Sequence, residues 1–149
     1  MKENTQEKYQ NKQKKHLLFW LISLGVIFIW SAIRPYHWPT WWLEMVPAIA
    51  AVTILAITYR KFQFTNLAYW LIWIHIIILM VGAHYTYAKV PLFDWFADLF
   101  DLSRNHYDRL GHFVQGFVPA IIAREVLLRK SPLNKGLWLF FIVVCICLA

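Results

Sequence analysis

The sequence predicts an all-α fold, a multi-pass transmembrane helical bundle with one amphipathic interfacial helix. Three apolar runs, at 17–33, 43–59 and 67–83, each hold about 17 residues, near the lower limit for crossing a hydrocarbon core about 30 Å thick. Hydrophobic residues make up 60% of the 149-residue chain and nine residues are tryptophan, a composition that suits a soluble protein poorly. The runs are continuous rather than alternating, so they favour helices over a transmembrane β-barrel.

Two further spans are expected after these three, at 109–128 and, in a shorter form, at 137–149. The last run stops after 13 residues, roughly 20 Å of helix, so we expect the chain to be cut off inside an element. All five spans are assigned to a single transmembrane domain, 16–149. The first span is interpreted as an uncleaved anchor, because its apolar core exceeds the usual length in a signal peptide. The polar tail, 1–15, has the composition of a disordered segment.

The distribution of charge predicts a topology. The formal net charge is +7, and eleven of the 15 lysines and arginines lie in the tail, after the second span or around the end of the fourth. The other side keeps only Arg34, Lys89, Arg104 and Arg109. This is the positive-inside pattern with a cytoplasmic N-terminus. Because no nucleic-acid motif accompanies the charge, the lipid bilayer is the expected partner and nucleic acid is not.

The segment 91–102, PLFDWFADLFDL, predicts the amphipathic helix. Asp94, Asp98 and Asp101 recur at i, i+4 and i+7 and form one acidic stripe, while the opposite face carries Phe, Trp and Leu. A proline opens the first turn, and such a helix is suited to lie flat at the membrane surface. The carboxylates either face water or line an entrance for a cation.

A polar cluster between the third and fourth spans is the one stretch that resembles a chemical site. Asp108, His112 and Gln115 recur at i, i+4 and i+7, so they share one stripe of a helix. The topology brings them to the same outer side as His84, and polar residues inside a span usually face the bundle. The candidate catalytic residues are His112, Asp108, His84 and His106, and the candidate substrate-binding residues are Arg104, Arg109, Lys89 and Gln115.

The residue types in this cluster suggest two chemistries and one structural alternative. An aspartate one turn before a histidine can hold the tautomer of the imidazole and raise its basicity, as in general acid–base sites. Arg104 and Arg109 suit a phosphate, which arginine binds by paired hydrogen bonds. The histidines and Asp108 also supply ligand types for zinc, but no compact signature such as HExxH is present, so no metal site is predicted. The alternative is an interhelical hydrogen-bond network that only orients the bundle.

Two more ionisable residues lie near or within the spans. His75 sits in the middle of the third span, and we expect it to be a neutral histidine paired to a neighbouring helix, with a proton relay as the alternative. Gly82, two turns later on the same face, marks a place where another helix could approach closely. Glu44, at the start of the second span, is expected to pair with an outer-side cation or to stay hydrated.

Four stretches resemble the YjdF-like bacterial inner-membrane proteins, a family of uncharacterised function. They are IWSAIRP, TWWLEMVP, LMVGAHYTYAKVPL and above all SRNHYDRLGHFVQGFVPAIIAREVLLR. The resemblance runs from about residue 29 to the C-terminus, and members of the family continue beyond it with a further hydrophobic and acidic portion. It implies a multi-pass protein of the bacterial inner membrane.

A shorter pattern, Asp108-Arg109-x-x-His112-Phe113, resembles the Asp-Lys-x-x-His-Phe pattern of VanZ-like membrane proteins, with Arg109 in place of the lysine. This resemblance implies a polar site at the membrane surface that acts on a lipid or a lipid-linked envelope intermediate.

Three functional hypotheses follow from these patterns. The first is an enzyme acting on a lipid head group, with His112 as general acid–base oriented by Asp108, Arg104 and Arg109 holding phosphate, and His84 assisting. The second is a transporter or ion-linked carrier that uses His75 and the outer cluster. The third is a non-catalytic accessory protein. The sequence leaves the reaction, any cofactor and the oligomeric state open.

Overall fold

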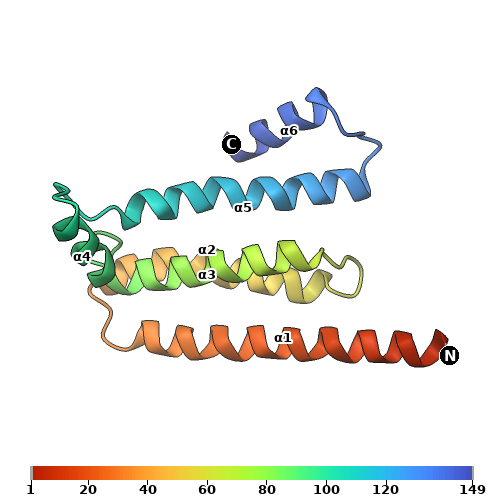
Figure 1. Cartoon of the computed structure of the whole chain (residues 1–149), viewed down its shortest axis with the longest axis horizontal. Helices are drawn as coiled ribbons and strands as arrows, with labels where there is room; N and C mark the ends of the chain where they lie inside the picture. Colours follow the sequence, from red (N-terminus) through yellow and green to blue (C-terminus); the bar gives the residue numbers. More distant parts are fainter. Residues whose placement is uncertain (1, 149) are drawn as a thin grey trace.

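The computed structural model describes the backbone of residues 2–148 and the side chains of residues 15–148. Its elements are α1 (Lys2–Ala32), α2 (Trp38–Thr58), α3 (Asn66–Tyr85), α4 (Pro91–Leu99), α5 (Tyr107–Lys130) and α6 (Leu137–Leu148). Helices α1, α2 and α5 each pack on α3, and α6 packs on α5 (Figure 1). All regular elements in the described range are helices, so the predicted fold class is confirmed.

Three helices of the described range are long and apolar enough to cross a membrane. They comprise Lys15–Ala32 of α1, Trp38–Thr58 and Asn66–Tyr85. Helix α5 has 24 residues, about 36 Å at 1.5 Å per residue, but its polar residues keep it outside this set. Helices α5 and α6 cover the fourth and fifth spans expected from the sequence, and their crossing of the membrane stays a prediction.

The polar tail differs from the expectation of disorder. Helix α1 begins at Lys2, so the helix continues through most of the tail into the first span. Lysine, glutamate and glutamine are good helix formers. Because the adjoining apolar span is already helical, extending the helix into the tail requires no new nucleation step. Met1 lies outside the described residues.

The core is a layer of apolar side chains on both sides of α3. Ile76 and Met80 of α3 belong to one buried cluster with Trp41 and Met45 of α2 and Val118 of α5, the two helices that pack on α3.

A buried polar contact joins three of the helices within this core. The Ser31 hydroxyl of α1 donates to the carbonyl oxygen of Met80 at 2.9 Å, and Trp41 Nε1 donates to the Ser31 oxygen at 2.8 Å. Hydrogen bonds of this kind replace the hydrophobic driving force that is missing between helices in lipid.

The two ends of the bundle carry different segments. One end holds the α1–α2 loop, α4 and the start of α5; the other holds the α2–α3 and α5–α6 loops and the chain's N-terminus (Figure 1). At the first end, α4 exposes Leu92, Trp95 and Leu99, as an interfacial helix would. Helix α4 ends at Leu99, three residues before the predicted limit, and Asp101 follows with a left-handed φ of 50°.

Candidate functional site

Asp108 and His112 form a side-chain pair near the beginning of α5. The His112 Nε2 atom lies 3.4 Å from Asp108 Oδ1, and the two side chains are 73% and 54% exposed, respectively. The spacing of the two residues in the sequence explains their contact, because residues four apart are neighbours on a helix surface. Asp108 also lies in the first turn of α5, where the helix dipole favours a carboxylate.

His84 is held by α1. Its Nδ1 atom lies 3.0 Å from the carbonyl oxygen of Ser31, so this nitrogen donates, and its ring stacks on Trp30 with 4.5 Å between centroids. The backbone N–H of Tyr36 donates to the His84 carbonyl oxygen at 2.9 Å. Among the described residues no hydrogen bond or ion pair joins His84 to α5, so the polar contacts of His84 are with α1 and not with Asp108 or His112. The direction of His84 depends on the rotation of α3 against α1, which the sequence pattern does not specify.

The candidate cationic side chains have different surroundings. Lys89 donates to the Tyr36 hydroxyl and its ammonium lies 3.6 Å from the centre of the Tyr36 ring, so it is tied to the α1–α2 loop. Arg104, Arg109 and Gln115 are exposed. Of these, Arg109 precedes His112 by three residues and is therefore its neighbour on the α5 surface.

The loop before α5 is fixed to α4 by Asn105. Its amide nitrogen donates to the carbonyl oxygen of Val90 at 2.9 Å and to Asp94 Oδ1 at 2.8 Å, while its oxygen accepts from the backbone N–H of Tyr107 at 3.0 Å. Asp94 is exposed to the surroundings and, through Asn105, also helps to hold the start of α5. His106 immediately precedes α5, and its Nδ1 atom is buried with no hydrogen-bond partner in the described part of the chain.

Tyr87 is the residue of this region that sequence reasoning missed. Its ring fills the space beside Gly82 of α3 and Gly111 of α5, where a Cβ atom at either glycine would collide with it. Its hydroxyl donates to Glu44 Oε2 of α2 at 3.0 Å. Tyr87 thus touches three helices, and the close approach expected at Gly82 is made by a tyrosine ring. Gly82 and Gly111 themselves were the available signal, because a glycine inside a helix can mark a close approach of another group.

The backbone and the electrostatics of Tyr87 suit this role. Thr86 and Tyr87 take left-handed φ values of 55° and 57°, which turn the chain back so that the Tyr87 N–H donates to the Gly82 carbonyl oxygen at 2.8 Å. Burial raises the pKa of the Tyr87 hydroxyl, and the charge of Glu44 raises it further. The phenol therefore stays protonated and can donate to the carboxylate. Glu44 accepts a hydrogen bond from a phenol, where the sequence suggested either an outer-side cation or hydration.

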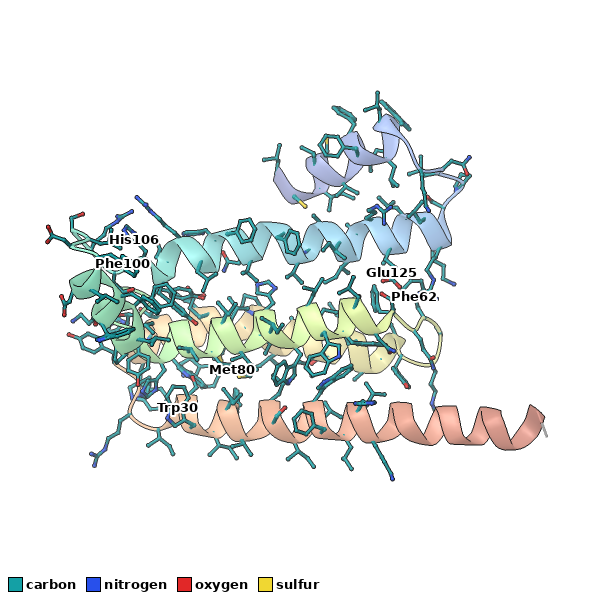
Figure 2. The ribbon with its side chains drawn as sticks, in the orientation of Figure 1. Trp30, Phe62, Met80, Phe100, His106 and Glu125 are labelled. Carbon is teal, nitrogen blue, oxygen red and sulfur yellow. The ribbon has the colours of Figure 1, made fainter. Side chains whose placement is uncertain are left out.

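A second acid–base pair lies at the far end of α5. Glu125 accepts hydrogen bonds from the backbone N–H and the hydroxyl of Thr65, both at 2.8 Å, and from Arg129 at 2.7 Å. Arg129 also donates to the Gln63 carbonyl oxygen at 2.6 Å and lies 4.3 Å from the centre of the Phe62 ring. Figure 2 shows Glu125 and Phe62 together at this end, opposite the end that carries His106. The pair therefore joins α5 to the α2–α3 loop.

His75 is the ionisable candidate in the middle of α3. Its Nε2 atom is buried, and no hydrogen-bond partner for it exists among the described residues. The expected pairing with a neighbouring helix is thus not seen at this nitrogen. Within the described residues, no group of three or more histidine, cysteine, aspartate or glutamate side chains is arranged to hold a metal ion.

Comparison with known proteins identifies a relative and a family. The chain is 44% identical over 128 residues to the inner membrane protein YjdF of Escherichia coli (strain K12), and this match covers 86% of the chain. The chain spans 61% of that relative's length. No solved structure matches the chain. This similarity and the three apolar helices support a location in the bacterial inner membrane. The family model described as "Predicted membrane protein (DUF2238)" matches residues 16–149, and the chain therefore belongs to this family of membrane proteins.

Proposed function

We propose that this protein acts on a lipid head group or a lipid-linked envelope intermediate at the start of α5. The observation that carries the proposal is the Asp108–His112 pair, 3.4 Å apart, with more than half of each side chain exposed. An exposed ion pair contributes little to stability, so stabilisation of the bundle does not account well for the presence of these two residues. The pair instead lies open to whatever reaches this end of the bundle.

The geometry suggests a role for each group. Asp108 Oδ1 lies 3.4 Å from Nε2 of His112, so a small side-chain rotation would let Asp108 accept a hydrogen bond from this nitrogen, fix the tautomer and leave Nδ1 free to take up or release a proton. Arg109, on the adjacent part of the α5 surface, and Arg104, in the preceding loop, would bind a phosphate group through their guanidinium N–H groups. His84 and Lys89 keep structural roles in this proposal, because each is held by α1 or by the α1–α2 loop.

The proposal includes an orientation in which the α4 end faces away from the cytoplasm. The loop residues Arg60 and Lys61 and the α5 residues Arg129 and Lys130 share the opposite end with the chain's N-terminus. The positive-inside rule would make that end cytoplasmic. Exposed Asp101 then belongs to the outer surface. Cysteines placed at Lys61 and Asp101, with Cys145 and Cys147 replaced, should react with an impermeant thiol reagent only at position 101 in intact cells. Reaction at position 61 alone would refute the orientation.

The test of the activity compares lipids in cells that produce the protein or its variants. Asp108→Asn and His112→Gln each remove the proton-transfer pair with little change in volume, and Asp101→Asn is the matched control because Asp101 is an exposed carboxylate outside the pair. We expect mass spectrometry to find a lipid or lipid-linked species that depends on the protein and on both members of the pair, but not on Asp101. Unchanged lipid pools beside altered ion or solute uptake would refute the proposal in favour of the carrier.

A further inference from the structure

Basic side chains from two helix ends gather around Phe62, at the end of the bundle opposite α4. The guanidinium carbon of Arg129 lies 4.3 Å from the centre of the Phe62 ring, and the ammonium of Lys130 lies 5.6 Å from it. Arg60 and Lys61 directly precede Phe62 in the chain, and both are exposed. These four cations form the Phe62 cluster, and Figure 2 shows Phe62 at this end.

Backbone contacts hold the segment that carries Phe62. The N–H groups of Lys61 and Phe62 both donate to the carbonyl oxygen of Thr58 at 2.8 Å, which closes the end of α2. Arg129 donates to the carbonyl oxygen of Gln63 at 2.6 Å, which ties the end of α5 to the next residue of the loop. The backbone positions of the cluster are therefore fixed relative to one another.

The cluster carries more positive charge than its acidic neighbour offsets. Glu125 pairs with Arg129 at 2.7 Å. Within residues 15–148, no carboxylate lies within ion-pair distance of Arg60, Lys61 or Lys130. Four cations and one carboxylate leave three positive charges around a single aromatic ring. Like charges held close together repel, and a bound anion would relieve that repulsion.

The position of the cluster along the bundle indicates the source of the anion. Helix α2 has 21 residues, about 31 Å at 1.5 Å per residue, which matches a hydrocarbon core about 30 Å thick. Arg60 and Lys61 follow its end and therefore lie at the level of the lipid head groups. Ile57, in the last turn of α2, and Leu67, in the first turn of α3, are exposed apolar side chains beside the cluster. Lipid chains can cover both of them, so the anion nearest the cluster is a lipid phosphate.

We propose that the Phe62 cluster binds the head group of an anionic phospholipid, with Arg60, Lys61 and Lys130 holding its phosphate. Basic sites at the ends of membrane helices suit such head groups. Arg129 adds its charge but mainly holds the loop, since its N–H groups already bond to Glu125 and to the loop backbone. The positive-inside pattern requires cations at one end of the spans but does not gather them around one ring. The proposal is independent of the function proposed for the α4 end.

The experiment measures lipid binding to the full chain in detergent. Native mass spectrometry follows titrations with dioleoylphosphatidylglycerol, which is anionic, and dioleoylphosphatidylcholine, which is not. We expect tighter binding of the phosphatidylglycerol. The combined variant Arg60→Gln, Lys61→Gln and Lys130→Gln should weaken that binding by about 10- to 100-fold, because each cation near an anionic lipid contributes about 5-fold. Binding of phosphatidylcholine should not change.

The matched control removes the same charge from the tail. Lys8→Gln, Lys12→Gln and Lys14→Gln together lower the net charge equally and should leave the preference for phosphatidylglycerol intact. Thermal unfolding without added lipid shows whether each variant is folded. If the cluster variant is not, Lys130→Gln alone should weaken binding by about 5-fold, and Lys130→Arg, which keeps the charge, should bind as the wild type does.

Three results would overturn the proposal. The first is equal binding of the two lipids by the wild-type protein. The second is equal weakening by the tail variant and the cluster variant, which would make the attraction a property of net charge alone. The third is displacement of phosphatidylglycerol by an equal concentration of inorganic phosphate, which would make the cluster a site for a soluble anion.

Discussion

The two ends of α5 use the same local pattern for different purposes. Each carries an acidic residue followed four positions later by a basic one, Asp108–His112 and Glu125–Arg129. At the far end, Glu125 is only 12% exposed and binds Thr65 of the neighbouring loop as well as Arg129. At the α4 end both partners are largely exposed. Helical spacing alone therefore does not distinguish an anchor between segments from a pair that is free to meet a ligand.

The α4 end is instead held by aromatic residues beneath the exposed pair. The Tyr107 hydroxyl donates to the Ile78 carbonyl oxygen of α3 at 2.9 Å, and the Tyr87 ring packs between Gly82 and Gly111. These contacts position the first turns of α5 without using Asp108 or His112. The comparison thus predicts that stability at this end depends on the tyrosines and glycines, and that function depends on the pair.

The largest loss of stability is expected from Glu125→Ala. It removes the acceptor for the N–H and hydroxyl of Thr65 and for Arg129, so we expect unfolding to become easier by about 1–3 kcal/mol. Thermal or denaturant unfolding of the purified protein in detergent measures this loss. Arg124→Gln, at the exposed neighbouring position, is the control and should change stability little. An unchanged stability in Glu125→Ala would contradict its role as an anchor.

The next prediction compares the effects on stability of substituting two glycines of α5. Gly111→Ala places a Cβ atom 2.8 Å from the Tyr87 ring, and we expect this overpacking to cost about 1–2 kcal/mol. Gly116→Ala, which has no heavy atom within 4 Å of the added Cβ, should instead stabilise the helix by about 0.5–1 kcal/mol. The same unfolding assay compares the two. Equal effects at both positions would show that Tyr87 is not packed against α5.

A smaller loss is expected from Tyr87→Phe. This variant keeps the ring between the glycines but removes the hydrogen bond to Glu44, so it should cost about 1 kcal/mol. The double variant, Tyr87→Phe with Glu44→Gln, should lose less stability than the sum of the losses in the two single variants, because both substitutions remove the same contact. Full additivity in a double-mutant cycle would contradict the contact.

The pH dependence of stability tests the same contact with a defined sign. The pKa of Tyr87 is raised above its ordinary value of 10.0 by burial and by Glu44, so the folded state keeps this proton longer than the unfolded state does. The stabilisation is fully present below pH 10 and declines as the pH rises above it. The difference in unfolding free energy between the wild type and Tyr87→Phe should therefore shrink in alkaline solution. A difference that grows with pH would refute the assignment.

Local sequence patterns were sufficient for much of this structure. Three apolar runs predicted the three long apolar helices, and the spacing of Asp108 and His112 predicted their contact. The pattern over 91–102 predicts the amphipathic helix, which in the structure ends three residues earlier, at Leu99. Each of these features depends on residues close together in the chain.

The features that were missed depend on non-local geometry. Tyr87 reaches Glu44 only because two consecutive residues adopt left-handed backbone angles after α3, a conformation unusual for threonine and tyrosine. His84 faces α1 because of how α3 is rotated in the bundle. The Glu125–Arg129 spacing was available in the sequence, but Thr65, 60 residues away, gives that pair its role.

The smallest effect on stability, and the most direct test of the account, comes from Asp108→Asn measured beside Glu125→Gln. Each variant is assayed for thermal unfolding and for the lipid species that depends on the protein. We predict that Asp108→Asn changes the unfolding free energy by no more than about 0.5 kcal/mol, as expected for an exposed pair, yet loses the lipid species. Glu125→Gln should be clearly less stable. An Asp108→Asn protein that is destabilised as much as Glu125→Gln, or that keeps the lipid species, would contradict the account.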